Sequence, residues 1–120
     1  MLVVDDEASV RDFIGAVLRK RGYRVLTAAE GREALSVFER ESGRIDLVVP
    51  DVIMPVMGGR ELLPRLKALK PELQVLVTSG YGESEARRLC AAFPGSTCIQ
   101  KPYTAQQIGE AVESLRETRR

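Results

Sequence analysis

The sequence predicts an α/β protein in which five strands alternate with five helices and form a doubly wound parallel sheet. Two observations support this prediction. Short, mostly apolar runs alternate with longer segments in which apolar residues recur every three or four positions. Short runs of this composition are typical of strands that are buried on both faces of a parallel sheet. The length of 120 residues suits one domain, so we expect a single domain over residues 1–120.

The five expected strands share this apolar composition. They are Leu2–Val4, Arg24–Ala28, Ile45–Val49, Leu73–Thr78 and Thr97–Gln100. Pro50 directly follows the third run. Proline has no backbone N–H to donate to a sheet, so we expect the third strand to lose a hydrogen bond or to end early at this point.

The first three helices are identified by apolar residues at helical spacing. Their expected inward faces are Val10, Phe13, Ile14, Val17 and Leu18 in the first, Ala34, Leu35 and Phe38 in the second, and Leu62, Leu63, Leu66 and Leu69 in the third. Gly43 lies near the end of the second helix, and the third ends before Pro71. Pro64 falls inside the third pattern and should kink that helix or delay its regular start.

The last two helices have clear end signals. A weaker pattern over Ser84–Phe93 predicts the fourth helix, which Pro94 and Gly95 end. Thr104 is a candidate N-cap for the fifth, because a threonine hydroxyl can accept a hydrogen bond from the first turn. The inner face of the fifth helix is expected to hold Ile108, Ala111, Val112 and Leu115.

Composition excludes several classes of function. The formal net charge of +1 gives no field that would attract nucleic acid or a membrane surface. Because no apolar run approaches ~18 residues and no secretory leader is visible, we expect a cytoplasmic protein. In that compartment Cys90 and Cys98 should be reduced, and we expect them to be at least partly buried. The chain has no histidine, which rules out Ser-His-Asp and Cys-His catalysis and the usual zinc motifs.

Charged residues follow three of the expected strands. Asp5 and Asp6 close the first run, Asp51 follows the third, and Lys101 follows the fifth. Ligands bind at the carboxyl edge of such sheets, where these side chains should meet. Three carboxylates at ~4 Å repel one another by about 4 kcal/mol per pair at an effective dielectric of ~20, so a cation is expected among them. The pattern predicts a divalent metal site with a carboxylate nucleophile.

Simpler interpretations of these residues remain open. The acidic group Asp5-Asp6-Glu7 could cap the first helix, because acids favour helix N-termini. Asp51 could be a turn residue, and Lys101 could be a solvated lysine at a strand end.

Four motifs, in this order and at this spacing, resemble the receiver domains of two-component response regulators along the whole chain. They are Leu2–Glu7, Asp46–Pro55 with Gly58-Gly59, Val77–Tyr81 and Gln100–Tyr103. The resemblance implies a flavodoxin-like (βα)5 fold with strand order 2-1-3-4-5. It also implies that Asp51 is the phosphoacceptor, and that Asp5, Asp6, Asp51 and the backbone carbonyl of Ile53 hold Mg²⁺.

The resemblance assigns further residues to the phosphoryl group. Ser79 would bond one phosphoryl oxygen and Lys101 would pair with another, with Thr78 as a rival hydroxyl. Pro102 would follow a cis peptide bond, a geometry that proline adopts far more readily than other residues.

One departure from the family pattern concerns switching. Cys98 stands three positions before Lys101, where these domains usually carry a switch aromatic. Tyr81 or Tyr103 could carry the signal instead.

The function implied is a phosphoacceptor domain that takes a phosphoryl group from a histidine kinase or histidine phosphotransfer domain. It would signal to a downstream protein through the face built by the fourth helix, fifth strand and fifth helix. Such a domain is not a conventional enzyme, although it catalyses its own phosphorylation and slow dephosphorylation. The motifs look most like receivers attached to hybrid sensor histidine kinases. Two alternatives are a Mg²⁺-dependent phosphohydrolase with an aspartyl nucleophile and a pseudo-receiver that is never phosphorylated.

Overall fold

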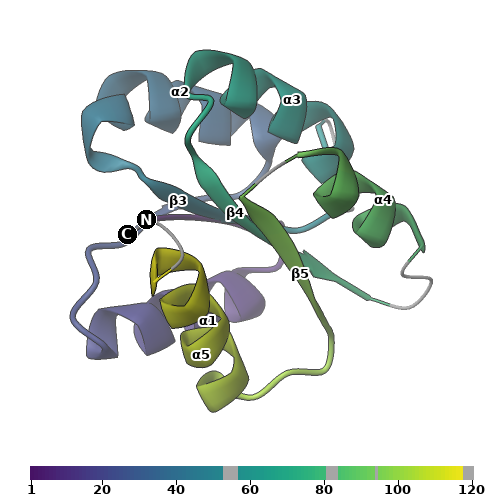
Figure 1. The fold of residues 1–120 in the computed structure, drawn as a ribbon. Coiled ribbons are helices and arrows are strands. Elements are labelled where there is room, and N and C mark those ends of the chain that lie inside the picture. The colour runs from purple at the N-terminus through teal and green to yellow at the C-terminus, as the bar shows by residue number, and fades with distance from the viewer. Residues whose placement is uncertain (53–56, 81–83, 94, 118–120) are drawn as a thin grey trace.

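The computed structural model describes residues 1–52, 57–80, 84–93 and 95–117 (Figure 1). Within these ranges five strands alternate with five α-helices, as the sequence predicts. The strands are β1 (Leu2–Val4), β2 (Leu26–Ala28), β3 (Leu47–Pro50), β4 (Gln74–Ser79) and β5 (Ser96–Gln100). The helices are α1 (Ala8–Lys20), α2 (Gly31–Glu41), α3 (Gly59–Leu69), α4 (Ser84–Ala92) and α5 (Ala105–Glu117), and a short 3-10 helix η1 (Ser42–Arg44) follows α2.

The strands form one parallel sheet in the order β2-β1-β3-β4-β5. This is the order that the family resemblance implies, so the predicted fold class is confirmed. The chain steps from β1 to β2 on one side and then to β3 on the other side of β1. Ligands of open α/β sheets bind at such a reversal, outside the carboxyl ends of the strands.

Helices cover both faces of the sheet. Figure 1 shows α2, α3 and α4 on one face and α1 and α5 on the other. Leu2 and Val4 pack into the core on one face, whereas Val3 packs into the core on the other, because successive side chains of a strand alternate. All three are 0% exposed, which explains why this run is continuously apolar.

The strand bounds match the predictions closely. β1 has the predicted ends, and the other strands differ by one or two residues at one end or at both ends. Ile45 is buried but precedes β3, and its carbonyl accepts a hydrogen bond from Lys70 Nζ at 2.8 Å. Burial alone therefore does not distinguish the residues just before this strand from the strand itself.

Pro50 does not end β3 early, because it is the last residue of that strand and lies beside Val4. The registered pairs between β3 and β4 are Leu47 with Gln74 and Val48 with Val75. Pairing resumes only at an isolated bridge between Asp51 and Thr78. Of the two outcomes expected for Pro50, the structure shows the lost pairing and not the early end.

Two sequence predictions about helices have different outcomes. The Thr104 hydroxyl accepts a hydrogen bond from the Gln107 N–H at 3.1 Å, and the Gln107 side chain accepts one from the Thr104 N–H at 2.7 Å. This capping box confirms the predicted cap of α5. Pro64 does not delay α3, since the helix begins at Gly59 and continues through the proline, and the alternative that Pro64 kinks this helix stays a prediction.

Phe13 and Leu69 were predicted to face the core, and this prediction is wrong. Phe13 is 41% exposed, whereas Ile14 is 1% exposed. Phe13 precedes Ile14 by one residue, or about 100° around the helix, and so lies at the edge of the buried stripe. Leu69 is 56% exposed because it is the last residue of α3, beyond the buried part of that helix.

The structure also describes the two cysteines and the length of the helices. Cys90 and Cys98 are both free and partly buried, as predicted. None of the helices in the described ranges is long and apolar enough to cross a membrane.

Candidate functional site

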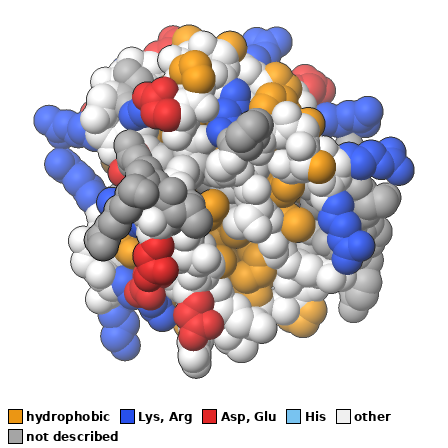
Figure 2. Space-filling model, in the orientation of Figure 1, with side chains coloured by type: hydrophobic (Ala, Val, Ile, Leu, Met, Phe, Trp, Pro, Cys, Tyr) orange, Lys and Arg blue, Asp and Glu red, His pale blue; other side chains and the backbone are white. Residues whose placement is uncertain are grey.

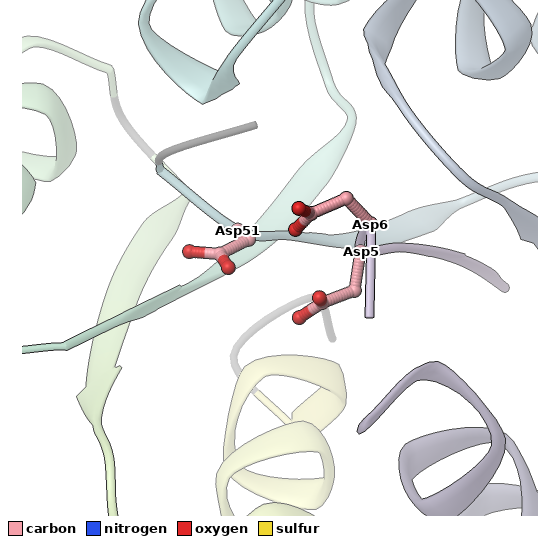
Figure 3. A group of neighbouring side chains, drawn as sticks. All are labelled: Asp5, Asp6 and Asp51. Carbon is pink, nitrogen blue, oxygen red and sulfur yellow. The ribbon is translucent and has the colours of Figure 1, made fainter. Parts of the chain in front are cut away.

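Three acidic side chains from two strand ends converge at the carboxyl edge of the sheet. Asp5 and Asp6 follow β1 and Asp51 follows β3, where the strand order reverses. Figure 3 shows the three carboxylates side by side. One oxygen from each lies within 4.8 Å of the others. Asp5 and Asp51 are buried, whereas Asp6 is exposed. The structure therefore brings together the acidic cluster that the sequence predicts.

Backbone contacts hold Asp5 in place. Its N–H donates to the carbonyl of Ala28 at 3.2 Å, and its own carbonyl accepts a hydrogen bond from Arg11 Nη1 at 2.7 Å. Asp5 Oδ1 accepts the Glu7 N–H at 2.9 Å, next to the start of α1. The N-cap residue of α1 is Glu7, and it makes no side-chain capping hydrogen bond, so the Asp5 contact orders the turn before the helix and does not cap the helix.

Lys101 links two of the carboxylates. Its Nζ lies 3.1 Å from Asp51 Oδ2 and 3.7 Å from Asp5 Oδ2. Burial alone would lower the pKa of Lys101, but the hydrogen bond to Asp51 and the charges of Asp51 and Asp5 outweigh burial and raise that pKa. Lys101 is therefore held as a cation inside the acidic cluster and is not a freely solvated strand-end lysine.

One lysine does not satisfy all the oxygens of the cluster. Asp5 Oδ2 is buried and takes no hydrogen bond from the described residues. Burial is the largest cause that raises the pKa of Asp5, and the charge of Asp51 raises this pKa further. The hydrogen bond from the Glu7 N–H lowers the pKa but does not outweigh these two causes. A buried carboxylate oxygen of this kind, beside two further carboxylates, fits a hard divalent cation that prefers oxygen ligands.

Two neighbouring hydroxyls end β4. Ser79 is buried, and its carbonyl accepts the Lys101 N–H at 2.7 Å, so β4 and β5 hold Ser79 close to the lysine. The hydroxyl of Thr78 donates to the carbonyl of Pro50 at 3.4 Å. Side chains alternate along a strand, so Thr78 and Ser79 point to different faces. Ser79, which ends β4 next to Lys101, stays the predicted ligand of an incoming group, with Thr78 as the rival hydroxyl.

Comparison with known proteins identifies the family of this site. A family model described as "Response regulator receiver domain" matches residues 1–113. The chain belongs to this family. It is 37% identical over 117 residues to the sensor kinase CckA of Brucella abortus, covering 98% of the chain and 12% of that protein. It is 33% identical over 113 residues to sporulation initiation phosphotransferase F of Bacillus subtilis, covering 94% of the chain and 90% of that protein.

Solved structures agree with this assignment. A response regulator receiver domain protein from Clostridium thermocellum aligns with a TM-score of 0.89 and 30% identity, covering 98% of this chain and 94% of that one. The receiver domain of the hybrid histidine kinase CckA aligns with a TM-score of 0.81 and 37% identity, covering 95% of each chain. The chain is therefore a phosphoacceptor signalling domain, as predicted, and such domains interact with histidine kinases or phosphotransfer proteins.

Other residues that the receiver pattern singles out lie near the cluster. The Lys101–Pro102 peptide bond is cis, as the resemblance implies. Tyr103 packs beside the core under α1 and α5, and burial raises the pKa of its phenol to about 12. Its hydroxyl is buried and has no hydrogen-bond partner among the described residues. Ile53 and Tyr81 lie outside the described residues, so their predicted roles stay predictions.

A groove that no sequence pattern predicted lies beside the acidic cluster. Its volume is about 290 Å³, and it lies between α1 and the segment after β5. The lining residues are Ser9, Val10, Phe13, Lys101, Pro102 and Tyr103. The only sequence signal is the place of Phe13 at the edge of the apolar stripe of α1.

Proposed function

We propose that Asp51 accepts a phosphoryl group from a phosphohistidine of a histidine kinase or histidine phosphotransfer domain. The observation that carries this proposal is the position of Lys101 Nζ, 3.1 Å from Asp51 Oδ2 and inside a cluster of three carboxylates. Asp51 is 8% exposed, so an incoming group can reach it while most water is excluded. Because the chain has no histidine, the donor must belong to a partner or to another part of a longer polypeptide.

The acidic cluster would hold Mg²⁺ through Asp5, Asp6 and Asp51. Magnesium keeps several waters and needs only one or two protein carboxylates, which suits a site with one exposed acid. When bound, the ion would supply positive charge that stabilises the oxygens of the transferring phosphoryl group. The family pattern adds the carbonyl of Ile53 as a further ligand.

The chain's own residues would perform the transfer as follows. A carboxylate oxygen of Asp51 attacks phosphorus, an O–P bond forms, and the P–N bond to the donor imidazole breaks. The Lys101 ammonium pairs with one phosphoryl oxygen, and the Ser79 hydroxyl donates to another. Lysine suits this role because its compact charge can follow a group that arrives and leaves.

Phosphorylation would then change the charge that Lys101 and Ser79 face. The acyl phosphate carries about two negative charges where the carboxylate carried one. Lys101 directly follows β5 and Ser79 ends β4, so movement toward the phosphoryl group would be transmitted to both strands. Figure 2 shows hydrophobic side chains on the surface over β5, next to α4 and α5. This face, built by α4, β5 and α5, would bind the downstream protein.

The groove next to Lys101 would receive the donor domain. It is continuous with the phosphoacceptor site, because Lys101 contacts Asp51 and also lines the groove. Phe13 offers an exposed aromatic ring at its wall. A helical donor surface seated on Phe13 would bring a phosphohistidine to Asp51.

The test of phosphorylation uses intact mass. Acetyl phosphate or a phosphorylated donor domain should add one phosphoryl group in Mg²⁺, and none in excess EDTA. Asp51→Asn should abolish the addition. Asp12→Asn, which removes an exposed carboxylate from α1, should leave it unchanged. A gain of one phosphoryl group by the Asp51→Asn protein at the wild-type rate would refute the assignment.

A second measurement tests the donor groove. Phe13→Ala should slow transfer from a protein donor by roughly tenfold, equivalent to about 1.4 kcal/mol at an interface anchor. Transfer from acetyl phosphate should not change, because a small donor does not need the groove. Leu69→Ala removes the other large exposed apolar side chain found among the described residues and should affect neither reaction. Equal slowing with both donors would show that Phe13 acts on the fold and not on docking.

A further inference from the structure

Two thiols meet where α4 packs on β5. Cys90 lies in α4 and Cys98 in β5. In the sheet Cys98 is paired with Val77, which belongs to the core under α2, α3 and α4. Cys90 and Cys98 both pack against that same core. Strand alternation therefore directs Cys98 toward the helix that carries Cys90.

The two side chains are neighbours at the junction of α4 and β5. The Cys98 thiol is near enough to Cys90 to affect its titration, and both thiols are free. Burial is the largest cause that raises the pKa of Cys90, to about 12, and the adjacent Cys98 adds to it. Both residues are only partly buried, so a small oxidant can reach the pair. Nearness of two thiols on different elements is a necessary condition for a disulfide.

We propose that Cys90 and Cys98 form a reversible intramolecular disulfide when a peroxide oxidises the protein. The bond would join α4 to β5 covalently. It would not involve the acidic cluster, and it requires no metal ion or phosphoryl donor.

The chemistry balances in two steps. The Cys98 thiolate attacks one oxygen of hydrogen peroxide, an S–O bond forms, the O–O bond breaks, and the second oxygen leaves as water after taking up a proton. Sulfur of Cys90 then attacks sulfur of Cys98, an S–S bond forms, the S–O bond breaks, and water leaves with the Cys90 proton. Together the two thiols lose two electrons and two protons, and the peroxide becomes two waters. The balance is the same if Cys90 makes the first attack and Cys98 the second.

The disulfide would act on the proposed output face, which is the face built by α4, β5 and α5 that would bind the downstream protein. α4 and β5 form two of the three elements of that face, so a covalent tether would restrict their movement when Asp51 is phosphorylated. This consequence rests on the proposed function, whereas formation of the disulfide does not. An oxidised receiver would still accept a phosphoryl group but would transmit it less well.

The experiment measures intact mass after treatment with hydrogen peroxide. The wild-type protein should lose two hydrogens, remain monomeric and recover its mass in dithiothreitol. Monomeric Cys90→Ser should not lose two hydrogens, and this variant should instead gain oxygen or form a disulfide-linked dimer through Cys98. Asp51→Asn should form the disulfide like the wild type. An unchanged wild-type mass, or a disulfide found only between two chains, would overturn the proposal.

Phosphorylation separates this proposal from the proposed function. Cys90→Ser should accept a phosphoryl group from acetyl phosphate at the wild-type rate. Oxidised and reduced wild type should also accept it equally, while backbone amide NMR signals of α4 and β5 should shift less in the oxidised protein. Equal shifts would overturn the tether, and failure of every form to accept a phosphoryl group would count against the proposed function alone.

Discussion

Replacing Asp5 with asparagine should stabilise the folded protein when no divalent cation is bound. The side chain of Asp5 is 1% exposed, and its Oδ2 has no hydrogen-bond partner among the described residues. Asparagine is almost the same size and keeps an acceptor for the Glu7 N–H, but it carries no charge. The substitution therefore removes a buried charge without leaving a cavity.

The magnitude follows from the distances in the site. At an effective dielectric of ~20, Asp5 repels Asp51 by about 3.5 kcal/mol at the 4.8 Å limit and attracts Lys101 by about 4.5 kcal/mol at 3.7 Å. These two contributions cancel to within about 1 kcal/mol, so the lost hydration of Asp5 determines the sign. An unsatisfied buried polar group costs about 1–3 kcal/mol, and Asp5→Asn should raise the free energy of unfolding by a similar amount.

The stabilisation should depend on pH. Burial, as the largest cause, raises the pKa of Asp5 above 3.8 in the folded protein, so the folded state binds this proton more tightly than the unfolded state. The wild-type stability that comes from Asp5 is therefore present below pH 3.8 and is lost as the pH rises through the raised pKa. The advantage of Asp5→Asn should be small near pH 3.8 and full at neutral pH.

The assay is urea unfolding followed by circular dichroism in EDTA. Mg²⁺ at ~100 times its dissociation constant should stabilise the wild type by about 2.7 kcal/mol, and Asp5→Asn by less. Asp12→Asn, an exposed control on α1, should stay within about 0.5 kcal/mol of the wild type. If Asp5→Asn were no more stable than the wild type in EDTA at neutral pH, the reasoning would be wrong, because the Asp5 charge would already be compensated.

Two further predictions concern metal binding and lifetime. Lys101→Ala should keep or slightly strengthen Mg²⁺ binding, because a nearby positive charge is lost, but it should weaken the response of the output face to beryllofluoride. Asp6→Ala should abolish Mg²⁺ binding. Titrations with the reverse pattern would show that Asp6 acts in the response and Lys101 in metal binding. In the family pattern the residues two after the phosphoacceptor and two after the conserved hydroxyl flank the path of the attacking water. Here these residues are Ile53 and Tyr81, which are bulky and carry no acid or amide, so the phosphorylated state should last minutes or longer. Ile53→Asn with Tyr81→Glu should speed its decay by ~10²-fold or less, and a half-life of seconds that these changes do not alter would contradict this explanation.

The arrangement of the sheet was predictable because it depends on composition and order. Continuous apolar runs arise where a strand is buried on both faces, and β1 shows this directly. The place of Asp5 and Asp51 at one edge follows from parallel strands alone.

Side-chain contacts between distant elements were not predictable. Nothing in the periodicity of α1 shows that Phe13 borders a groove with Tyr103, because the relative placement of α1 and the segment after β5 depends on tertiary packing. The nearness of Cys90 to Cys98 was missed for the same reason. The prolines predicted local changes in structure only in part, because α3 begins before Pro64 and continues through it.

The dispersed origin of the site along the chain has a consequence for synthesis. Asp51 and the Lys101 that neutralises it are 50 positions apart, and Asp5 lies near the other end of the chain. A growing polypeptide displays all three carboxylates well before β5 leaves the ribosome, so the acids are present without their lysine until residue 101 has been translated. Signalling competence should therefore arise late and abruptly, and a chain cut short before Lys101 should carry the acceptor aspartate without the partner that makes it useful.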